Sequence, residues 1–85
     1  MRWDLVITRP AARDHKSFSR DDLRRIDTVF EAMRNNPYSG DIKFLAGTGG
    51  TLRRRVGVWR IFFEVHQRQH NVFILAVRRR TSTTY

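Results

Sequence analysis

The 85-residue sequence lacks cysteine altogether and contains only two prolines and five glycines. Without cysteine, neither a disulfide framework nor a thiolate metal site is available. His15, His66 and His70 lack the spacing of a zinc motif, so we expect no metal and no cofactor. The longest apolar run, residues 72–77, is far shorter than the roughly 20 residues needed to span a bilayer. With no secretion signal behind the N-terminus, these absences predict a soluble cytoplasmic protein without a membrane partner.

Acidic residues are scarce in the second half of the chain. Residues 1–42 carry eight Lys and Arg against seven Asp and Glu, whereas residues 43–85 carry nine against one. The formal net charge of +9 therefore resides almost entirely in the second half, and 15 of the 17 cations are arginine. Arginine grips phosphate bidentately and stacks on bases. The asymmetry favours a nucleic acid or ribosomal partner over an acidic protein partner alone.

The length and the hydrophobic content of 40% are enough for one core but not for two, so residues 1–85 are expected to form a single domain. Apolar residues alternate in residues 2–8, which predicts a strand. Pro10 suits the first turn of a short helix over residues 10–16. Ser19 with Asp22 resembles a capping box, followed by helical apolar spacing that predicts a helix over residues 20–34.

Residues 38–44 are interpreted as a connector, and the glycine-rich residues 47–50 as a turn, since a phosphate-binding loop would lead into a helix. Three strands are then expected, over residues 51–56, 59–66 and 72–77. The order β-α-α-β-β-β predicts an α+β fold, with a largely antiparallel sheet and two helices packed on one face. One core is expected to combine Leu23, Ile26, Phe30 and Met33 with Leu5, Ile7, Ile61 and Phe63.

Alternation along the second expected strand puts Arg53 and Arg55 on one face and Arg54 on the other. If Arg60 of the next strand lies beside Arg55, the sheet holds a cluster of three arginines. Such a cluster repels itself unless an anion or solvent screens it. A phosphate-rich ligand is the natural counter-charge, and a solvated strand face with Glu64 as partner is the alternative.

The strings LRRRVGVWRIFFEV and VFILAVRRRTSTTY resemble the second half of the RelE toxins of bacterial toxin–antitoxin pairs. The FLAGTGG loop and the element order fit as well, so the resemblance covers nearly the whole chain. It implies a small sheet with two helices, a cognate antitoxin as partner, and entry into the ribosomal A site to cut messenger RNA. The implied chemistry is attack of a ribose 2′-OH on the adjacent phosphate.

The resemblance also implies catalytic residues. Arg53 and Arg55 match the family's basic pair on the second strand, Arg60 the arginine after the aromatic, Arg80 the arginine beyond the fourth strand, and Tyr85 the tail tyrosine. Further cations are expected to bind RNA, namely Lys43, Arg54, Arg78 and Arg79.

The chain departs from those relatives that have lysine, glutamate or histidine where a general base is needed. Arginine stays protonated at any working pH and is a poor base. The base is then Tyr85, which we favour, or His66, Glu64 or a ribosomal group. Two other functions stay open. One is that of the ParE branch of the superfamily, which poisons DNA gyrase without nuclease activity, and the other is that of a catalytically inert RNA-binding or antitoxin-binding relative.

Overall fold

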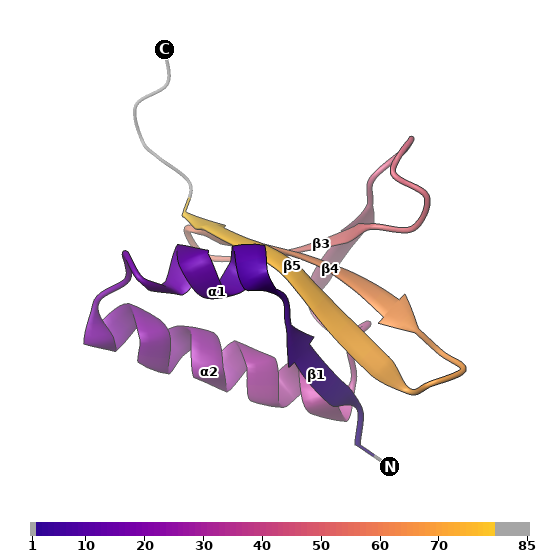
Figure 1. Cartoon of the computed structure of the whole chain (residues 1–85), viewed down its shortest axis with the longest axis horizontal. Coiled ribbons are helices and arrows are strands. Elements are labelled where there is room, and N and C mark those ends of the chain that lie inside the picture. The colour runs from indigo at the N-terminus through magenta and orange to yellow at the C-terminus, as the bar shows by residue number, and fades with distance from the viewer. Residues whose placement is uncertain (1, 80–85) are drawn as a thin grey trace.

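The computed structural model describes residues 2–79, which form two helices beside one five-stranded sheet (Figure 1). In chain order the elements are β1 (Asp4–Ile7), α1 (Arg9–His15), α2 (Arg20–Asn35), β2 (Asp41–Phe44), β3 (Leu52–Val56), β4 (Trp59–His66) and β5 (Asn71–Arg79). The predicted α+β class is confirmed. No helix in this part of the chain is long and apolar enough to cross a membrane.

The strands lie in the order β1-β5-β4-β3-β2. Each neighbouring pair from β2 to β5 is antiparallel, as expected for strands that follow one another through short turns. β1 instead pairs in parallel with β5, with Leu5 opposite Val72. Parallel pairing needs a long crossover, and the two helices between β1 and β2 are part of it. The sheet is therefore largely antiparallel, with one parallel edge strand.

The interpretation of residues 38–44 as a connector is wrong, because Asp41–Phe44 form the edge strand β2. This strand has four residues, of which only Ile42 is half-buried, so its apolar pattern is too short to be recognised. Its order comes from pairing with β3. The glycine-rich loop closes the hairpin, where the Thr48 hydroxyl donates to the Leu45 carbonyl (2.6 Å) and accepts from the Thr51 N–H (3.0 Å).

Local chemistry sets the helix ends. The Ser19 hydroxyl accepts a hydrogen bond from the Asp22 N–H at 3.1 Å, as the sequence predicted, and relieves one unpaired donor of the first turn of α2. Asn36 ends the helix in an extended conformation directly before Pro37. α1 starts with Pro10 in its first turn, where a missing N–H costs nothing.

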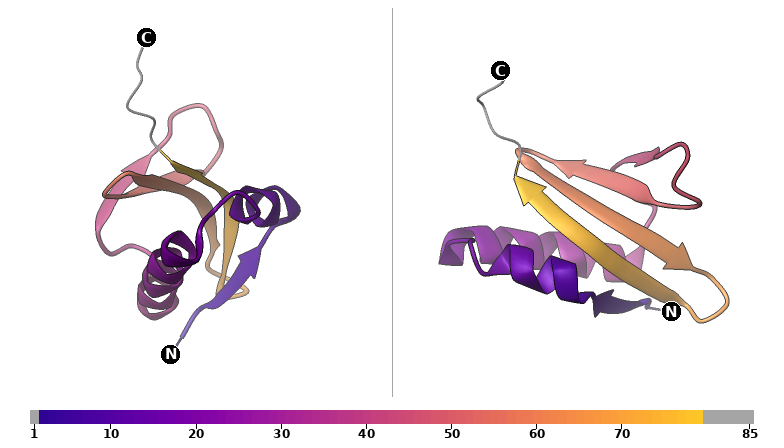
Figure 2. Two further views of the ribbon diagram at one scale, coloured as in Figure 1. Left: turned by 90° about the vertical axis from the view of Figure 1, so that its left-hand side faces the viewer. Right: turned by 45° about the horizontal axis from the view of Figure 1, so that its top comes forward.

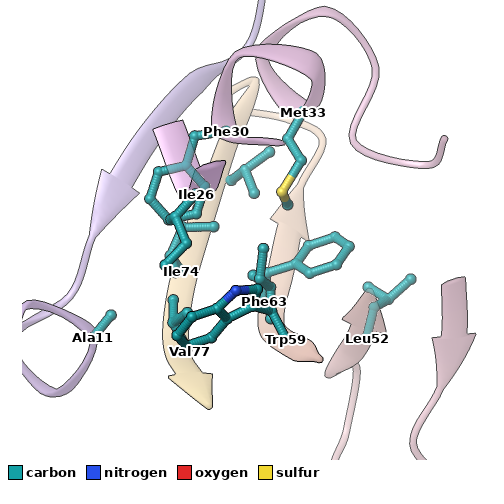
Figure 3. Packing of buried hydrophobic residues seen from close by; sticks show 11 residues of the cluster. Ala11, Ile26, Phe30, Met33, Leu52, Trp59, Phe63, Ile74 and Val77 are labelled. Carbon is teal, nitrogen blue, oxygen red and sulfur yellow. The ribbon is translucent and has the colours of Figure 1, made fainter. Parts of the chain in front are cut away.

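The core lies between the helices and one face of the sheet (Figure 3). Helix α2 contributes Ile26, Phe30 and Met33, which pack against alternate residues of β4 and β5. Ile7 and Leu23 were both expected in this core. Ile7 is 37% exposed because β1 is a short edge strand, and Leu23 is only half-buried and lies outside the core cluster. The buried members are Ala11, Ile26, Phe30, Met33, Leu52, Trp59, Ile61, Phe63, Val72, Ile74 and Val77.

Both helices cover the same face of the sheet (Figure 2). We call the opposite face, which no described helix covers, the open face. Because buried Leu52, Ile61 and Ile74 point toward the helices, alternation turns their neighbours toward the open face. A β-bulge between the Phe62 and Phe63 pairs adds one residue to β5, and this preserves the alternation on both sides of it.

Candidate nucleic-acid interface

A row of three arginines crosses the open face. Arg55 in β3 pairs directly with Arg60 in β4, and Arg60 pairs directly with Arg78 in β5. Directly opposed side chains on one face have Cβ atoms about 4.5 to 5.5 Å apart. The expectation that Arg60 lies beside Arg55 is thus met by the strand register, and Arg78 extends the cluster by one strand. We call these three residues the arginine row.

A second pair of cations, Lys43 and Arg53, lies beside the row. The Arg53 side chain is only 19% exposed, and its Nη2 lies 3.6 Å from Asp41 Oδ1. The Nε atoms of Arg53 and Arg60 are both buried without a hydrogen-bond partner. Two guanidinium groups are therefore held partly desolvated on the open face with donor capacity unused.

The electrostatics of this face favour an anion. Like charges directly opposite each other on a sheet destabilise it. Within residues 2–79, neither Arg55 nor Arg60 has an ion-pair partner. The acids that contact cations of this face are Asp41, which lies near Arg53, and Asp14, which lies near Arg78. A phosphate group would relieve the repulsion between the arginines and could accept bidentate hydrogen bonds from their planar guanidinium groups. The arrangement can bind phosphate and stabilise developing negative charge, but it cannot accept a proton.

Helix α1 holds one end of the arginine row through Asp14, a residue whose role had no signal in the local sequence pattern. Asp14 Oδ2 accepts a hydrogen bond from the Val77 N–H at 2.9 Å and lies 3.6 Å from Arg78 Nε. The Asp14 carboxylate thus accepts the Val77 N–H in the part of β5 that extends beyond the end of β1, and it also holds Arg78 of the arginine row in place.

We expect Asp14→Ala to lower the free energy of unfolding by about 1 to 3 kcal/mol, because it leaves the part-buried Val77 N–H without an acceptor. Asp14→Asn keeps an acceptor oxygen and should lose less. Urea unfolding followed by circular dichroism measures both. Equal losses for the two variants would contradict the hydrogen-bond explanation.

Two further predicted RNA-binding residues lie on the helix side of the sheet, away from the arginine row. Arg54 donates from Nη1 to Ser39 Oγ at 3.2 Å, and burial lowers the pKa of its guanidinium. It also packs so closely on Gly40 that a Cβ there would meet the guanidinium at 3.1 Å. Arg79 lies over the Trp59 ring, 5.6 Å from its centroid. The structure therefore does not bring Arg54 and Arg79 together with Arg55, Arg60 and Arg78.

The remaining candidates fall elsewhere. Arg80 and Tyr85 lie outside the described residues. Glu64 and His66 form a pair on the open face, with Glu64 Oε1 and His66 Nε2 3.2 Å apart, toward the far end of β4 from Arg60. No group of three or more potential metal ligands occurs among residues 2–79.

An apolar groove of about 510 Å³ lies on the helix side, between α2 and the β3–β4 hairpin. Ile26 and Val29 form its helix wall, and Val58 and Trp59 lie on the hairpin side. The Trp59 Nε1 is buried and has no hydrogen-bond partner among the described residues. The groove is thus separate from the arginine row and differs from it in chemistry.

The family model and the solved structures that match this chain both describe toxins of toxin–antitoxin systems. A family model described as the ParE toxin of the type II toxin–antitoxin system parDE matches residues 5–83. The toxin–antitoxin complex RelBE2 from Mycobacterium tuberculosis contains a chain that is 26% identical, with a TM-score of 0.80, over 94% of this chain and 100% of that one. No curated protein sequence was found to match.

Two more distant structures share the fold. A chain of the archaeal RelE–RelB complex from Pyrococcus horikoshii is 22% identical, with a TM-score of 0.79, over 98% of this chain and 100% of that one. The isolated E. coli RelE toxin is 13% identical, with a TM-score of 0.79, over 95% of this chain and 87% of that one. Thus the same small sheet with its helices recurs at low sequence identity.

Proposed function

Since the chain belongs to the ParE toxin family of type II toxin–antitoxin systems, within the RelE/ParE superfamily, we propose that it is a toxin that cuts messenger RNA in the ribosomal A site. The observation that supports this activity best is the arginine row on the open face. Cleavage by a ribose 2′-OH adds negative charge to the scissile phosphate, and positioned guanidinium groups stabilise that charge. Because the proposed substrate is ribosome-bound mRNA, the proposal also places the protein in the cytoplasm. The chain is proposed to act as a single domain.

Each residue has a distinct proposed role. Arg60 contacts the scissile phosphate, while Arg53 and Arg55 bind it or its neighbours from β3. Arg80 and Tyr85, proposed on sequence alone, complete the catalytic set. Lys43 and Arg78 bind the RNA backbone on either side. Arg54 and Arg79 were also expected to bind RNA, but they lie on the helix side of the sheet and are given no role at this site.

A second candidate function follows from the family model itself, which describes a ParE toxin. In that case the protein would inhibit DNA gyrase through protein contact and cut no RNA. The arginine row would then serve a protein or DNA partner, and no proton transfer would be needed.

Primer extension on mRNA bound to programmed ribosomes, run beside a gyrase supercoiling assay, separates the two functions. We expect primer extension to stop at a new 5′ end within the A-site codon, and supercoiling to be unchanged. Arg24→Ala is a matched control, because it removes one arginine from the exposed side of α2. Intact mRNA with inhibited gyrase would overturn the proposed nuclease and support the second candidate.

The partner we infer is a cognate antitoxin carrying an acidic, amphipathic segment. Such a segment would neutralise the arginine row and could extend past the β3–β4 turn into the apolar groove, whose lining includes Gly57 and Val58 of that turn. We expect co-expression with the antitoxin to raise the soluble yield sharply, because an unscreened basic face binds cellular RNA. Yield with and without the partner measures this. A toxin that is well tolerated and purifies at high level alone would contradict it.

A further inference from the structure

The open face carries two phenylalanines that the core does not account for. Phe62 lies between the buried Ile61 and Phe63 in β4, and Phe73 lies between the buried Val72 and Ile74 in β5. Both rings are half-buried, and neither belongs to the helix-side core or packs against it. Part of each ring is exposed on a face that no described helix covers, where a binding partner can reach it.

The two rings lie on the adjacent strands β4 and β5, as diagonal neighbours on the open face. Glu64, two residues after Phe62, pairs directly with Phe73. Diagonal neighbours of this kind are about 7 to 8 Å apart, a separation that nearby bases of an extended single strand can span. The His66 ring continues the line, with its centroid 4.6 Å from that of Phe73. The open face therefore has an aromatic path beside the arginine row.

The cations next to these rings fit a phosphate backbone. Phe62 pairs directly with Arg53, and Arg60 lies two residues before Phe62 on the same face. Both arginines have a buried Nε without a partner. Sheet surfaces that bind unpaired RNA combine aromatic rings, which stack on bases, with guanidinium groups, which bind phosphates. A duplex keeps its bases stacked inside and could not use the rings.

We propose that Phe62 and Phe73 form a stacking platform for two unpaired bases of single-stranded RNA, whose phosphates lie along the arginine row. The inference rests on the proposed function and deepens it by naming the residues that bind the bases next to the cut. The carboxylates of an acidic protein segment would also pair with the guanidinium donors of this face, so the feature that distinguishes RNA is the pair of rings, on which bases stack. The platform therefore favours RNA.

The test compares two labelled oligonucleotides with the same number of phosphates, a decauridine RNA and its abasic counterpart, by fluorescence anisotropy on the full chain. The wild type should bind decauridine at least tenfold more tightly, since stacking strengthens binding severalfold to a hundredfold per base. Phe62→Leu and Phe73→Leu should each remove about five- to tenfold of that preference. They should leave abasic binding and the salt dependence unchanged.

Matched variants separate stacking from charge and from folding. Phe44→Leu changes a phenylalanine that is 69% exposed and lies outside the open face, so it should bind like the wild type. Arg55→Ala should weaken binding of both oligonucleotides and reduce the salt slope by about 0.7. If Phe62→Leu fails to fold, Phe62→Tyr keeps a stacking ring and should retain the wild-type preference for bases.

Equal binding of decauridine and the abasic strand by the wild type would overturn the platform. So would leucine variants that lose affinity for the antitoxin alone, because the face would then be a protein-docking surface. Cleavage on programmed ribosomes is measured in parallel. A wild type that cuts mRNA but ignores bases overturns only the platform, whereas one that prefers bases but cuts nothing overturns only the proposed nuclease.

Discussion

The Arg60→Ala variant is expected to cut ribosome-bound mRNA about 10² to 10³ times more slowly than the wild type, the usual loss for one donor that stabilises an oxyanion. Arg60 is the central member of the arginine row, with Arg55 and Arg78 on its two sides. The buried Trp59 and Ile61 flank it and fix the strand beneath it. Its guanidinium is therefore the best-positioned donor for a phosphate.

Single-turnover cleavage on programmed ribosomes measures this loss, and binding of the ribosome is measured separately. Arg24→Ala should keep the wild-type rate, because it removes the same charge from α2. Arg54→Ala should stay within a few-fold in rate, although it loses the hydrogen bond to Ser39 and some stability. An Arg60→Ala variant within threefold of the wild type, with its folded state intact, would remove Arg60 from the catalytic set.

Much of the fold could be predicted because its signals are local. The Ser19 cap and the apolar spacing of α2 are written in consecutive residues, and the alternation in β4 is long enough to define two faces. β2 could not be predicted in the same way, because four residues with one half-buried side chain acquire their order from β3. The parallel pairing of β1 with β5 is equally non-local, since it depends on where the two helices return the chain.

The features of the candidate site also divide into those set by local sequence, which could be predicted, and those set by contacts between distant residues, which could not. Alternation alone placed Arg53 and Arg55 opposite Arg54, since side-chain period on a strand is fixed. The direct pairing of Arg60 with Arg78 depends on the register of the β4–β5 hairpin, which no residue pattern specified. Asp14 was missed for a related reason, because its contact with β5 joins residues 63 positions apart. The catalytic and binding roles themselves remain predictions.

The arginine row does not include a group that can carry out the proton transfers that RNA cleavage requires. Cleavage requires a group that takes the proton of the 2′-OH or supplies one to the leaving 5′-oxygen, and guanidinium groups do neither readily. On the open face, Glu64 and His66 can titrate, but Glu64 is four residues along β4 from Arg60, about 13 Å at the usual rise. A phosphate bound at Arg60 is out of reach of that pair.

Tyr85 is the alternative that the sequence favours. It lies outside the described residues, but it follows Arg79, the last residue of β5, by only six positions. Six residues of chain span at most about 20 Å, and β5 ends next to Arg78 of the arginine row. The connection is therefore long enough for the phenol to reach a phosphate bound there.

We expect Tyr85→Phe to lower the single-turnover cleavage rate by about 10² or more, and Tyr85→Ala to lower it by a similar factor. A ring that only stacks on a base would lose little on conversion to phenylalanine, so the Phe variant isolates the hydroxyl. Glu64→Gln and His66→Gln are the controls, and both should stay within a few-fold because they lie beyond reach of Arg60. A Tyr85→Phe variant as fast as the wild type, with one of these controls impaired, would transfer the acid–base role to the Glu64–His66 pair and require the substrate to bind further along β4.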